Sequence, residues 1–304
     1  MTINPAIDRT VSVDKLVFED RAYIQSRTEA AGGRGVNASR VIHEFGAKTL
    51  ALLTAGGDTG ERMLKSLGGM GFPFEAVRVR SATRINATIS DKQGLTIKLN
   101  EIGEALDARE LNELRQRVEA RIAKAHWLMI CGSIPPGVTP HFYCEIIEMA
   151  KAAGVKTLVD TDGDALLHSL EARPTVITPN QHEGERLLGR ALVTRGQFLE
   201  AVDRLQKMGP ESVILSLGSR GAVASAPDGV WEALPPRVDV LCPIGAGDAM
   251  AAAFLWSMEK KKSFAESLRW GVAAGTAKAT LPGMTFPNLE QARAIYKQVE
   301  VRPA

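Results

Sequence analysis

The sequence has few cysteines, no long apolar run and no signal-peptide pattern. Its three cysteines, Cys131, Cys144 and Cys242, are widely spaced and form neither a metal-ligand pair nor a redox dithiol. We therefore expect reduced thiols and a cytoplasmic location. No uninterrupted apolar stretch approaches the roughly 18 residues of a membrane span, and Asp8 and Arg9 lie where a signal peptide would be apolar. No membrane partner is expected.

The charges are balanced, and two common nucleotide-binding signatures are missing. Lysine and arginine together number 37 and aspartate and glutamate 35, so the formal net charge of +2 favours no nucleic-acid partner. No G-x-x-x-x-G-K-[ST] occurs, and no G-x-G-x-x-G follows a first strand. The sequence therefore disfavours a P-loop kinase and a dinucleotide-dependent oxidoreductase.

The spacing of apolar residues predicts an α/β protein of one large domain or two smaller ones. Between residues 100 and 300, short runs of valine, isoleucine and leucine alternate with segments of helical period, as in βαβ units around a parallel sheet. Buried strands are expected at 125–131, 155–160, 175–178 and 212–217. Helices are expected after Asp107, Thr139, Thr194, Gly245 and Phe264.

The first hundred residues have a different pattern. Segments 11–18, 22–28, 83–91 and 95–99 are typical of short antiparallel strands with two unlike faces. They would form a small sheet beside the main one. Such a sheet has a face that substrate, a partner subunit or both must cover.

A glycine turn that leads into an alanine-rich helix is the most informative segment. Residues 243–248 are Pro-Ile-Gly-Ala-Gly-Asp, and small residues follow. They leave backbone N–H groups uncovered at the positive end of a helix, which makes an anion site. A carboxylate beside that anion, Asp248, suits proton removal from an incoming hydroxyl. The alternative is that Asp248 only complements the helix dipole, which stabilises a helix by about 0.3–1 kcal/mol.

A second glycine-rich turn, at residues 31–40, opens another helix, and with it the whole sequence resembles a known family. It is similar to the PfkB (ribokinase-like) carbohydrate kinases, in their branch of phosphofructokinases, fructose-1-phosphate kinases and tagatose-6-phosphate kinases. The matching motifs follow the family's order along nearly the whole chain. They are 4–8 (NPAID), 32–37 (GGRGVN), 83–86 (TRIN), 132–137 (GSIPPG), 178–183 (TPNQHE), 216–218 (SLG) and 245–248 (GAGD).

The resemblance implies one ribokinase-like domain over residues 1–304. Its fold would be a three-layer α/β/α arrangement with a mostly parallel sheet, plus a small β-sheet lid drawn from about 11–28 and 83–99. A homodimer through this lid is also implied.

On the sugar side, the resemblance implies that Asp8 and Asn37 hold hydroxyl groups and that the backbone at Gly33 packs against the sugar ring. Arg84 would bind a phosphate already on the sugar, since a guanidinium makes paired charge-assisted bonds. Arg34, which stands where the family commonly has lysine, is a weaker candidate for this phosphate. The further substrate-side residues are Asn86 and, as another weak phosphate candidate, Arg21. Each arginine could equally be a solvated surface residue.

On the nucleotide side, the resemblance implies that Asn180 and Glu183 position Mg²⁺ through water. The alternative is a helix-capping box, with which the metal role is compatible. ATP would contact Asn180, Ser216, Gly218, Gly221 and Gly283. Backbone amides of Gly245, Ala246 and Gly247 would stabilise the transferring group beside Asp248. The histidines His43, His126, His141, His168 and His182 form no ligand pattern and are expected to be structural or exposed.

These residues predict an ATP-dependent kinase that phosphorylates a primary hydroxyl of a sugar phosphate. Fructose 1-phosphate is the first choice, because residues 4–6 and 83–86 most resemble the fructose-1-phosphate kinases. Fructose 6-phosphate and tagatose 6-phosphate are the alternatives within the same class. A sugar-phosphate sensor without catalysis is the alternative from another class.

Overall fold

A mixed β-sheet forms the body of the protein, and the computed structural model describes residues 1–17 and 19–304. The strands of the body are β3 (Ala51–Ala55), β4 (Phe74–Arg78), β7 (Trp127–Cys131), β8 (Lys156–Asp160), β9 (Val176–Ile177), β10 (Ser212–Ser216), β11 (Ala222–Ala226), β12 (Gly229–Leu234) and β13 (Glu300–Pro303). Their order from β7 to β13 follows the sequence. β7 to β10 are parallel, whereas β11 to β13 complete that edge in antiparallel pairs. Thr2 bridges β7 to β3, which pairs in parallel with β4.

Helices cover both faces of this sheet. They are α1 (Arg34–Glu44), α2 (Gly57–Gly68), α3 (Ala108–Ile122), α4 (Phe142–Ala152), α5 (Gly163–Ser169), α6 (Gln181–Leu188), α7 (Arg195–Lys207), α8 (Ala246–Glu259), α9 (Phe264–Ala279) and α10 (Leu289–Tyr296). Successive strand residues point to opposite faces. Val159 and Val213 therefore pack in one core with α3, α4 and α7, whereas Leu158 and Ile214 pack with α8 and α9. The expected three-layer arrangement with a mostly parallel sheet follows from this alternation.

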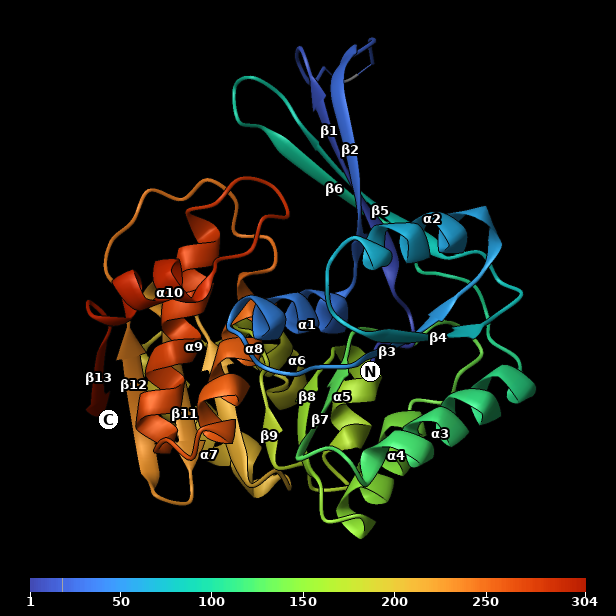
Figure 1. Ribbon diagram of the computed structural model, residues 1–304. Coiled ribbons are helices and arrows are strands. Elements are labelled where there is room, and N and C mark those ends of the chain that lie inside the picture. Colours follow the sequence, from blue (N-terminus) through green and yellow to red (C-terminus); the bar gives the residue numbers. More distant parts are fainter. Residues whose placement is uncertain (18) are drawn as a thin grey trace.

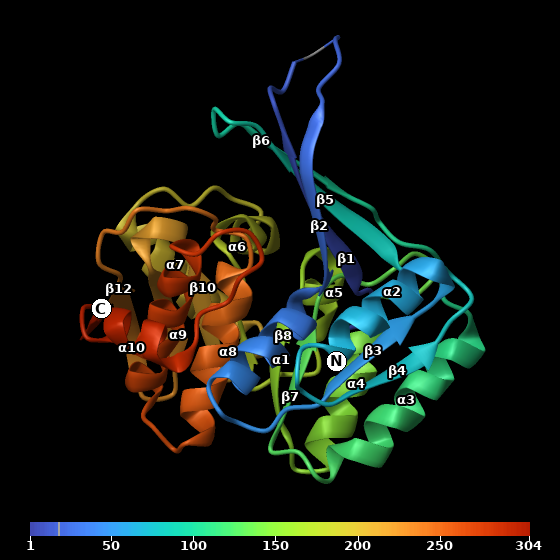
Figure 2. The same ribbon diagram turned by 45° about the horizontal axis from the view of Figure 1, so that its top comes forward.

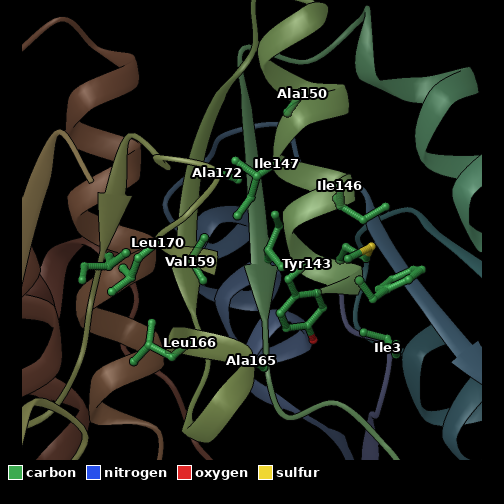
Figure 3. Packing of buried hydrophobic residues seen from close by; sticks show 14 of the residues in the cluster. Ile3, Tyr143, Ile146, Ile147, Ala150, Val159, Ala165, Leu166, Leu170 and Ala172 are labelled. Atoms are coloured by element: carbon green, nitrogen blue, oxygen red, sulfur yellow. The ribbon is translucent and has the colours of Figure 1, made fainter. Parts of the chain in front are cut away.

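Helix α4 also supports the loop that follows β7. Figure 3 shows Tyr143, Ile146 and Ile147 of α4 in the same apolar cluster as Val159 of β8. The hydroxyl of Tyr143, although buried, donates a hydrogen bond to the Gly132 carbonyl at 2.9 Å. This bond fixes the loop that follows β7.

A small sheet projects from the body in both views (Figures 1 and 2). Its strands are β1 (Ala6–Val13), β2 (Ile24–Gly32), β5 (Arg84–Ser90) and β6 (Thr96–Asn100), in the order β2-β1-β5-β6. We call this sheet the lid. The expectation of antiparallel pairing was wrong for its central pair, because β1 and β5 are parallel. β1 also begins five residues earlier than expected, and β2 continues to Gly32, where α1 follows.

The expected strands of the body are present, and one expected helix begins later than its predicted start. The strands expected at 125–131, 155–160, 175–178 and 212–217 are confirmed as β7 to β10. α4 begins after His141, not after Thr139, whose hydroxyl accepts a hydrogen bond from the His141 amide. Phe18, the expected end of the first lid strand, lies outside the described residues.

Cys131, Cys144 and Cys242 are free thiols. Within residues 1–17 and 19–304, no helix has the length and apolar character to span a bilayer. The expected cytoplasmic location stays a prediction.

Candidate active site

A cleft of about 880 Å³ lies between the lid and the body. The lid contributes polar side chains from β1, β5 and β6 to its wall, whereas the body contributes the starts of α1, α5 and α8 and the loops after β7, before α8 and after α9. Residues of five expected motifs meet here although they are distant in sequence. These are Asn4 and Asp8, Gly33 to Asn37, Arg84 and Asn86, Gly132 and Ser133, and Gly245 and Asp248.

The N-terminus of α8 opens into this cleft. Its N-cap, Gly245, has a left-handed backbone with φ of 82°. A Cβ atom there would also come within 2.9 Å of the Phe286 ring, so glycine is required. The Ala246 amide donates to the Pro243 carbonyl at 3.1 Å. Among the described residues, the amides of Gly245, Gly247 and Asp248 have no acceptor, so these three, and not Ala246, are free to bind an anion.

Asp248 lies in the first turn of α8 and contacts the start of α1. The Asn37 side chain donates a hydrogen bond to Asp248 Oδ2 at 2.7 Å, across 211 positions of sequence. Burial and, after it, the neighbouring charge of Asp160 raise the pKa of Asp248 to about 7. The Asn37 bond and the charge of Arg34 act in the opposite direction. A carboxyl with a pKa near neutrality suits a general base.

Arg34 is surrounded by carboxylates of the protein itself. Its guanidinium contacts Asp160 at 2.8 Å, Asp162 at 2.5 Å and Glu183 at 3.2 Å. These charges raise the pKa of Arg34 despite its burial. A sugar phosphate would have to compete with these partners, so the structure favours an internal ion-pair role for Arg34 over phosphate binding.

The predicted sugar-side residues of the lid form a connected group. Asn86 donates to Asp8 Oδ1 at 3.1 Å, and burial raises the pKa of Asp8. Asn86 Oδ1 is buried without a partner among the described residues. Arg84 donates to the carbonyls of Asn4, at 3.2 Å, and Glu101, at 2.8 Å, which leaves its Nη2 atom without a partner in the described chain. Burial lowers the pKa of Arg84.

The expected metal residues form a capping box at the start of α6. The Asn180 side chain accepts from the Glu183 amide at 3.0 Å, and Glu183 Oε2 accepts from the Asn180 amide at 2.8 Å. Burial raises the pKa of Glu183. Because its other oxygen accepts from Arg34, the remaining lone pairs of Glu183 fit a metal-bound water better than a bare ion.

The expected nucleotide residues surround the same end of the sheet. Asn180 bridges Ser216 at the end of β10. Gly218 and Gly221 belong to the turn that leads into β11, where the Gly221 amide donates to the Gly218 carbonyl at 3.0 Å. Gly283 lines the cleft near Gly245, whereas Ser216, Gly218 and Gly221 are outside its lining.

Sequence reasoning missed several residues of the site. Asp160 ends β8, Asp162 follows it, and both hold Arg34; their place at the end of a buried strand was the available signal. Lys98 of β6 adds a positive charge to the cleft wall, whereas Arg21 is exposed and outside it.

The expectation that the histidines form no ligand pattern was incomplete. His141, His168 and Glu171 come together on the surface, away from the cleft lining, with their ligand atoms within 4.8 Å of one another. The sequence spacing of these residues gives no sign of this contact.

A helix end with free amides, a carboxyl of raised pKa and a lid that lines the same cleft together fit a phosphoryl-transfer site. Residues 2–292 match the model of the pfkB family of carbohydrate kinases, so the chain belongs to that family. One relative is the 1-phosphofructokinase of Vibrio cholerae, 28% identical over 302 residues, which cover 99% of this chain and 95% of the relative. Another is the ATP-dependent 6-phosphofructokinase isozyme 2 of Mycobacterium tuberculosis, 28% identical over 98% of this chain and 88% of the relative.

Solved structures agree with this assignment. Phosphofructokinase-2 from Escherichia coli in complex with potassium superimposes with a TM-score of 0.91 at 27% identity, over 98% of this chain and 97% of that chain. The tetrameric inhibited form of the same enzyme gives 0.89 at 28% identity, with the same coverage. Ribokinase from Arabidopsis thaliana, at 21% identity and a TM-score of 0.78 over 97% of each chain, shares the fold. The ribokinase-like fold and the family resemblance are thereby confirmed, and family members use ATP as co-substrate.

Proposed function

We propose that this carbohydrate kinase transfers the γ-phosphate of ATP to a primary hydroxyl of a ketohexose monophosphate. Fructose 1-phosphate is the first choice, and fructose 1,6-bisphosphate is then the product. The 2.7 Å bond between Asn37 and Asp248 carries the proposal, because it joins the expected sugar ligand to the expected base at a helix end that can bind phosphate. Relatives named 1-phosphofructokinase and 6-phosphofructokinase support this substrate class.

In the proposed reaction, Asp248 takes the proton of the sugar hydroxyl. The oxygen of that hydroxyl attacks the γ-phosphorus in line with the leaving ADP. The hydrogen bond from Asn37 holds the carboxylate in place. The free amides of Gly245, Gly247 and Asp248 stabilise negative charge on the transferring group. The pKa of Asp248, at about 7, lets the group accept a proton near neutral pH.

The lid supplies the proposed recognition of the sugar phosphate. The buried Oδ1 of Asn86 lacks a donor among the described residues, and a sugar hydroxyl would satisfy it. Asp8 can accept from a second hydroxyl. The Nη2 atom of Arg84, which has no partner in the described part of the chain, and the ammonium of Lys98 provide positive charge for the phosphate.

Magnesium fits the charge of this site. Several carboxylates lie around Arg34 and Asp248, although both proposed substrates are anions. They are Asp8, Asp160, Asp162 and Glu183, in addition to Asp248 itself. Glu183 and Asn180 would hold the ion through water, and the ion would neutralise charge on the ATP phosphates.

A homodimer through the lid is also proposed. Apolar side chains of the lid, including Tyr23, Ile24, Leu95 and Leu99, are exposed in the single chain. A second copy would bury them. Analytical ultracentrifugation tests this, since a monomer at enzymatic concentrations would contradict it.

The function is tested by a coupled ADP-release assay with ATP, Mg²⁺ and a panel of sugars. We expect the highest kcat/KM with fructose 1-phosphate, lower values with fructose 6-phosphate and tagatose 6-phosphate, and little turnover of unphosphorylated fructose. Faster turnover of fructose than of its phosphates would contradict the proposed role of Arg84. Calorimetric binding of a sugar phosphate without any ADP release would favour the sensor.

A further inference from the structure

The last turn of α9 contains a lysine whose side chain is completely buried. Lys278 is 0% exposed, although lysine is almost never fully buried unless it is paired. Within the described residues, no carboxylate lies within ion-pair distance of it. Its Nζ atom donates to the carbonyl oxygens of Cys242, at 3.2 Å, and Gly283, at 2.9 Å. The ammonium also lies 5.6 Å from the centre of the Phe286 ring.

The two carbonyl partners belong to chain segments that meet at the α8 end of the cleft. Residues 241–245 lead into α8, and residues 283–284 follow α9, and both segments line the cleft. The amides of Leu241 and Cys242 also donate to the Ala279 carbonyl, at 2.8 and 3.0 Å. Arg40 of α1 donates to the Met284 carbonyl at 3.1 Å. Both segments are therefore fixed to neighbouring helices, and Lys278 joins one segment to the other.

Close packing of α9 on α8 brings Lys278 to this position. A Cβ atom at Gly275 would come within 2.9 Å of the Ala246 carbonyl, so α9 lies directly against the first turn of α8. Lys278 follows one helical turn later. Its Cε atom lies 3.6 Å from the position that a Cβ atom on Gly245 would take. The ammonium is thus directly behind the turn that exposes the free amides.

We infer that Lys278 is a positioning residue for phosphoryl transfer, whose ammonium acts as a built-in monovalent cation that joins the segment before Gly245 to the loop at Gly283. In this role it holds the turn before α8 in the arrangement that exposes the amides of the anion site. Its two carbonyl partners are of the same ligand type as the backbone carbonyl oxygens that replace the hydration shell of a bound potassium ion. Because the cation is covalently attached, turnover needs no free monovalent cation. The kinetic part of this inference rests on the proposed function.

The test replaces the ammonium by an uncharged group of similar shape, Lys278→Met, in the full chain. Kinetics are measured with tetramethylammonium as the monovalent cation, then with ammonium or potassium chloride at constant ionic strength. We expect kcat/KM for ATP to fall by at least about tenfold, since the anion site loses its alignment. Ammonium or potassium ions should restore part of the loss, whereas the wild-type rate should be the same in all three salts.

Lys151→Met is the matched control. Lys151 also donates to a backbone carbonyl, that of Ala172 at 3.0 Å, but it lies outside the cleft lining. This variant should keep wild-type kinetics in all three salts. A folded Lys278→Met variant with unchanged kinetics would overturn the inference, as would a kinetic loss that neither ion restores.

Thermal unfolding separates this inference from the proposed function. Ammonium chloride should raise the Tm of Lys278→Met relative to tetramethylammonium chloride and leave the wild-type Tm unchanged. That result supports the built-in cation even if no sugar phosphate is turned over, which would refute the function alone. If Lys278→Met does not fold, Lys278→Ala is purified in ammonium chloride. Failure of both variants to fold there assigns the lysine to the core only and overturns the positioning role.

Discussion

Some helices of this protein begin with a capping side chain and others begin without one. The described N-caps that line the cleft belong to the second group. Five helices away from the cleft lining begin at a residue whose side chain accepts a hydrogen bond from a first-turn amide. They are α3 at Asp107, α6 at Asn180, α7 at Thr194, α9 at Ser263 and α10 at Asn288. Among the described residues, α1 at Gly33, α5 at Asp162 and α8 at Gly245 have no such bond, and all three N-caps line the cleft.

The helix ends that face the cleft lack the stabilisation of a capping side chain and leave groups available for binding. A capping side chain stabilises a helix by about 1 kcal/mol. Glycine at the N-cap of α1 and α8 costs only about a few tenths of a kcal/mol relative to such a cap, and it leaves amides for a ligand. At α5, Asp162 pairs with Arg34 and not with its own helix. α2 and α4 also lack a side-chain cap, so a missing cap marks a site only where the helix end lines the cleft.

Among substitutions at the helix ends that face the cleft, replacing Asp248 with asparagine should have the largest effect on catalysis. We expect kcat to fall by about 10³-fold, because the base is lost while the shape of the side chain is kept. ADP release measures this effect. Near-normal turnover would refute the assignment of the base.

The same variant should be more stable than the wild type at alkaline pH. The pKa of Asp248 is raised to about 7 in the folded protein, so folding favours the protonated form, and stability is lost as pH rises toward 7. At pH 8 we expect Asp248→Asn to gain on the order of 2 kcal/mol, allowing for the partial exposure of this residue to the cleft. The gain should be absent at pH 4, and urea unfolding at both pH values measures it.

Gly245→Ala should lower kcat/KM by about 100-fold and stability by about 1–3 kcal/mol, because a left-handed residue gains a side chain that meets Phe286. Gly247→Ala is the matched control, since a Cβ atom there meets open space. It should keep the wild-type stability. Equal destabilisation by both changes would show that the turn does not depend on the backbone of Gly245.

Asn37→Ala should move the pH dependence of kcat/KM. The Asn37 bond lowers the pKa of Asp248, so its loss should raise that pKa. The acidic limb of the rate profile should therefore shift to higher pH. An unchanged midpoint, whatever the absolute rate, would contradict the contact between these residues in solution.

Thr194→Ala at the capped end of α7 should have the smallest effect on catalysis. We expect a loss of about 1 kcal/mol in stability, because the Gln197 amide loses its acceptor, and unchanged kcat/KM. Denaturant unfolding and ADP release measure the two quantities. A tenfold change in kcat/KM would remove the distinction between capped and open helix ends.

Local signals in the sequence predicted the features that depend on neighbouring residues. The strand at 155–160 is a short segment rich in valine and leucine, and the Asn180 and Glu183 pair lies three residues apart, so both were visible without a fold. The glycine turn before Asp248 was visible for the same reason. The assembly of these parts into one cleft came from the family resemblance.

Contacts between distant residues could not be predicted in this way. The parallel pairing of β1 with β5 joins residues 78 apart, such as Asp8 and Asn86, and strand patterning says nothing of direction. The carboxylates that hold Arg34 lie 126 to 149 positions away. Lys278 resembles an ordinary lysine in the last turn of a helix, which is normally exposed. Only the packing of α9 on α8 makes it a buried cation.

The chain is anchored in the body just before the first strand of the lid. A tilt of the lid would therefore turn about a point inside the body. Thr2 bridges β3 and β7, and four residues later the same chain enters the lid as β1, which carries Asp8. A tilt of the lid about residues 3–5 therefore changes the separation of Asp8 from Asp248. In the proposed function, a tilt that brings Asp8 onto the sugar would also shield the phosphoryl group from water, so a sugar that Asp8 does not hold would leave the reaction exposed to solvent.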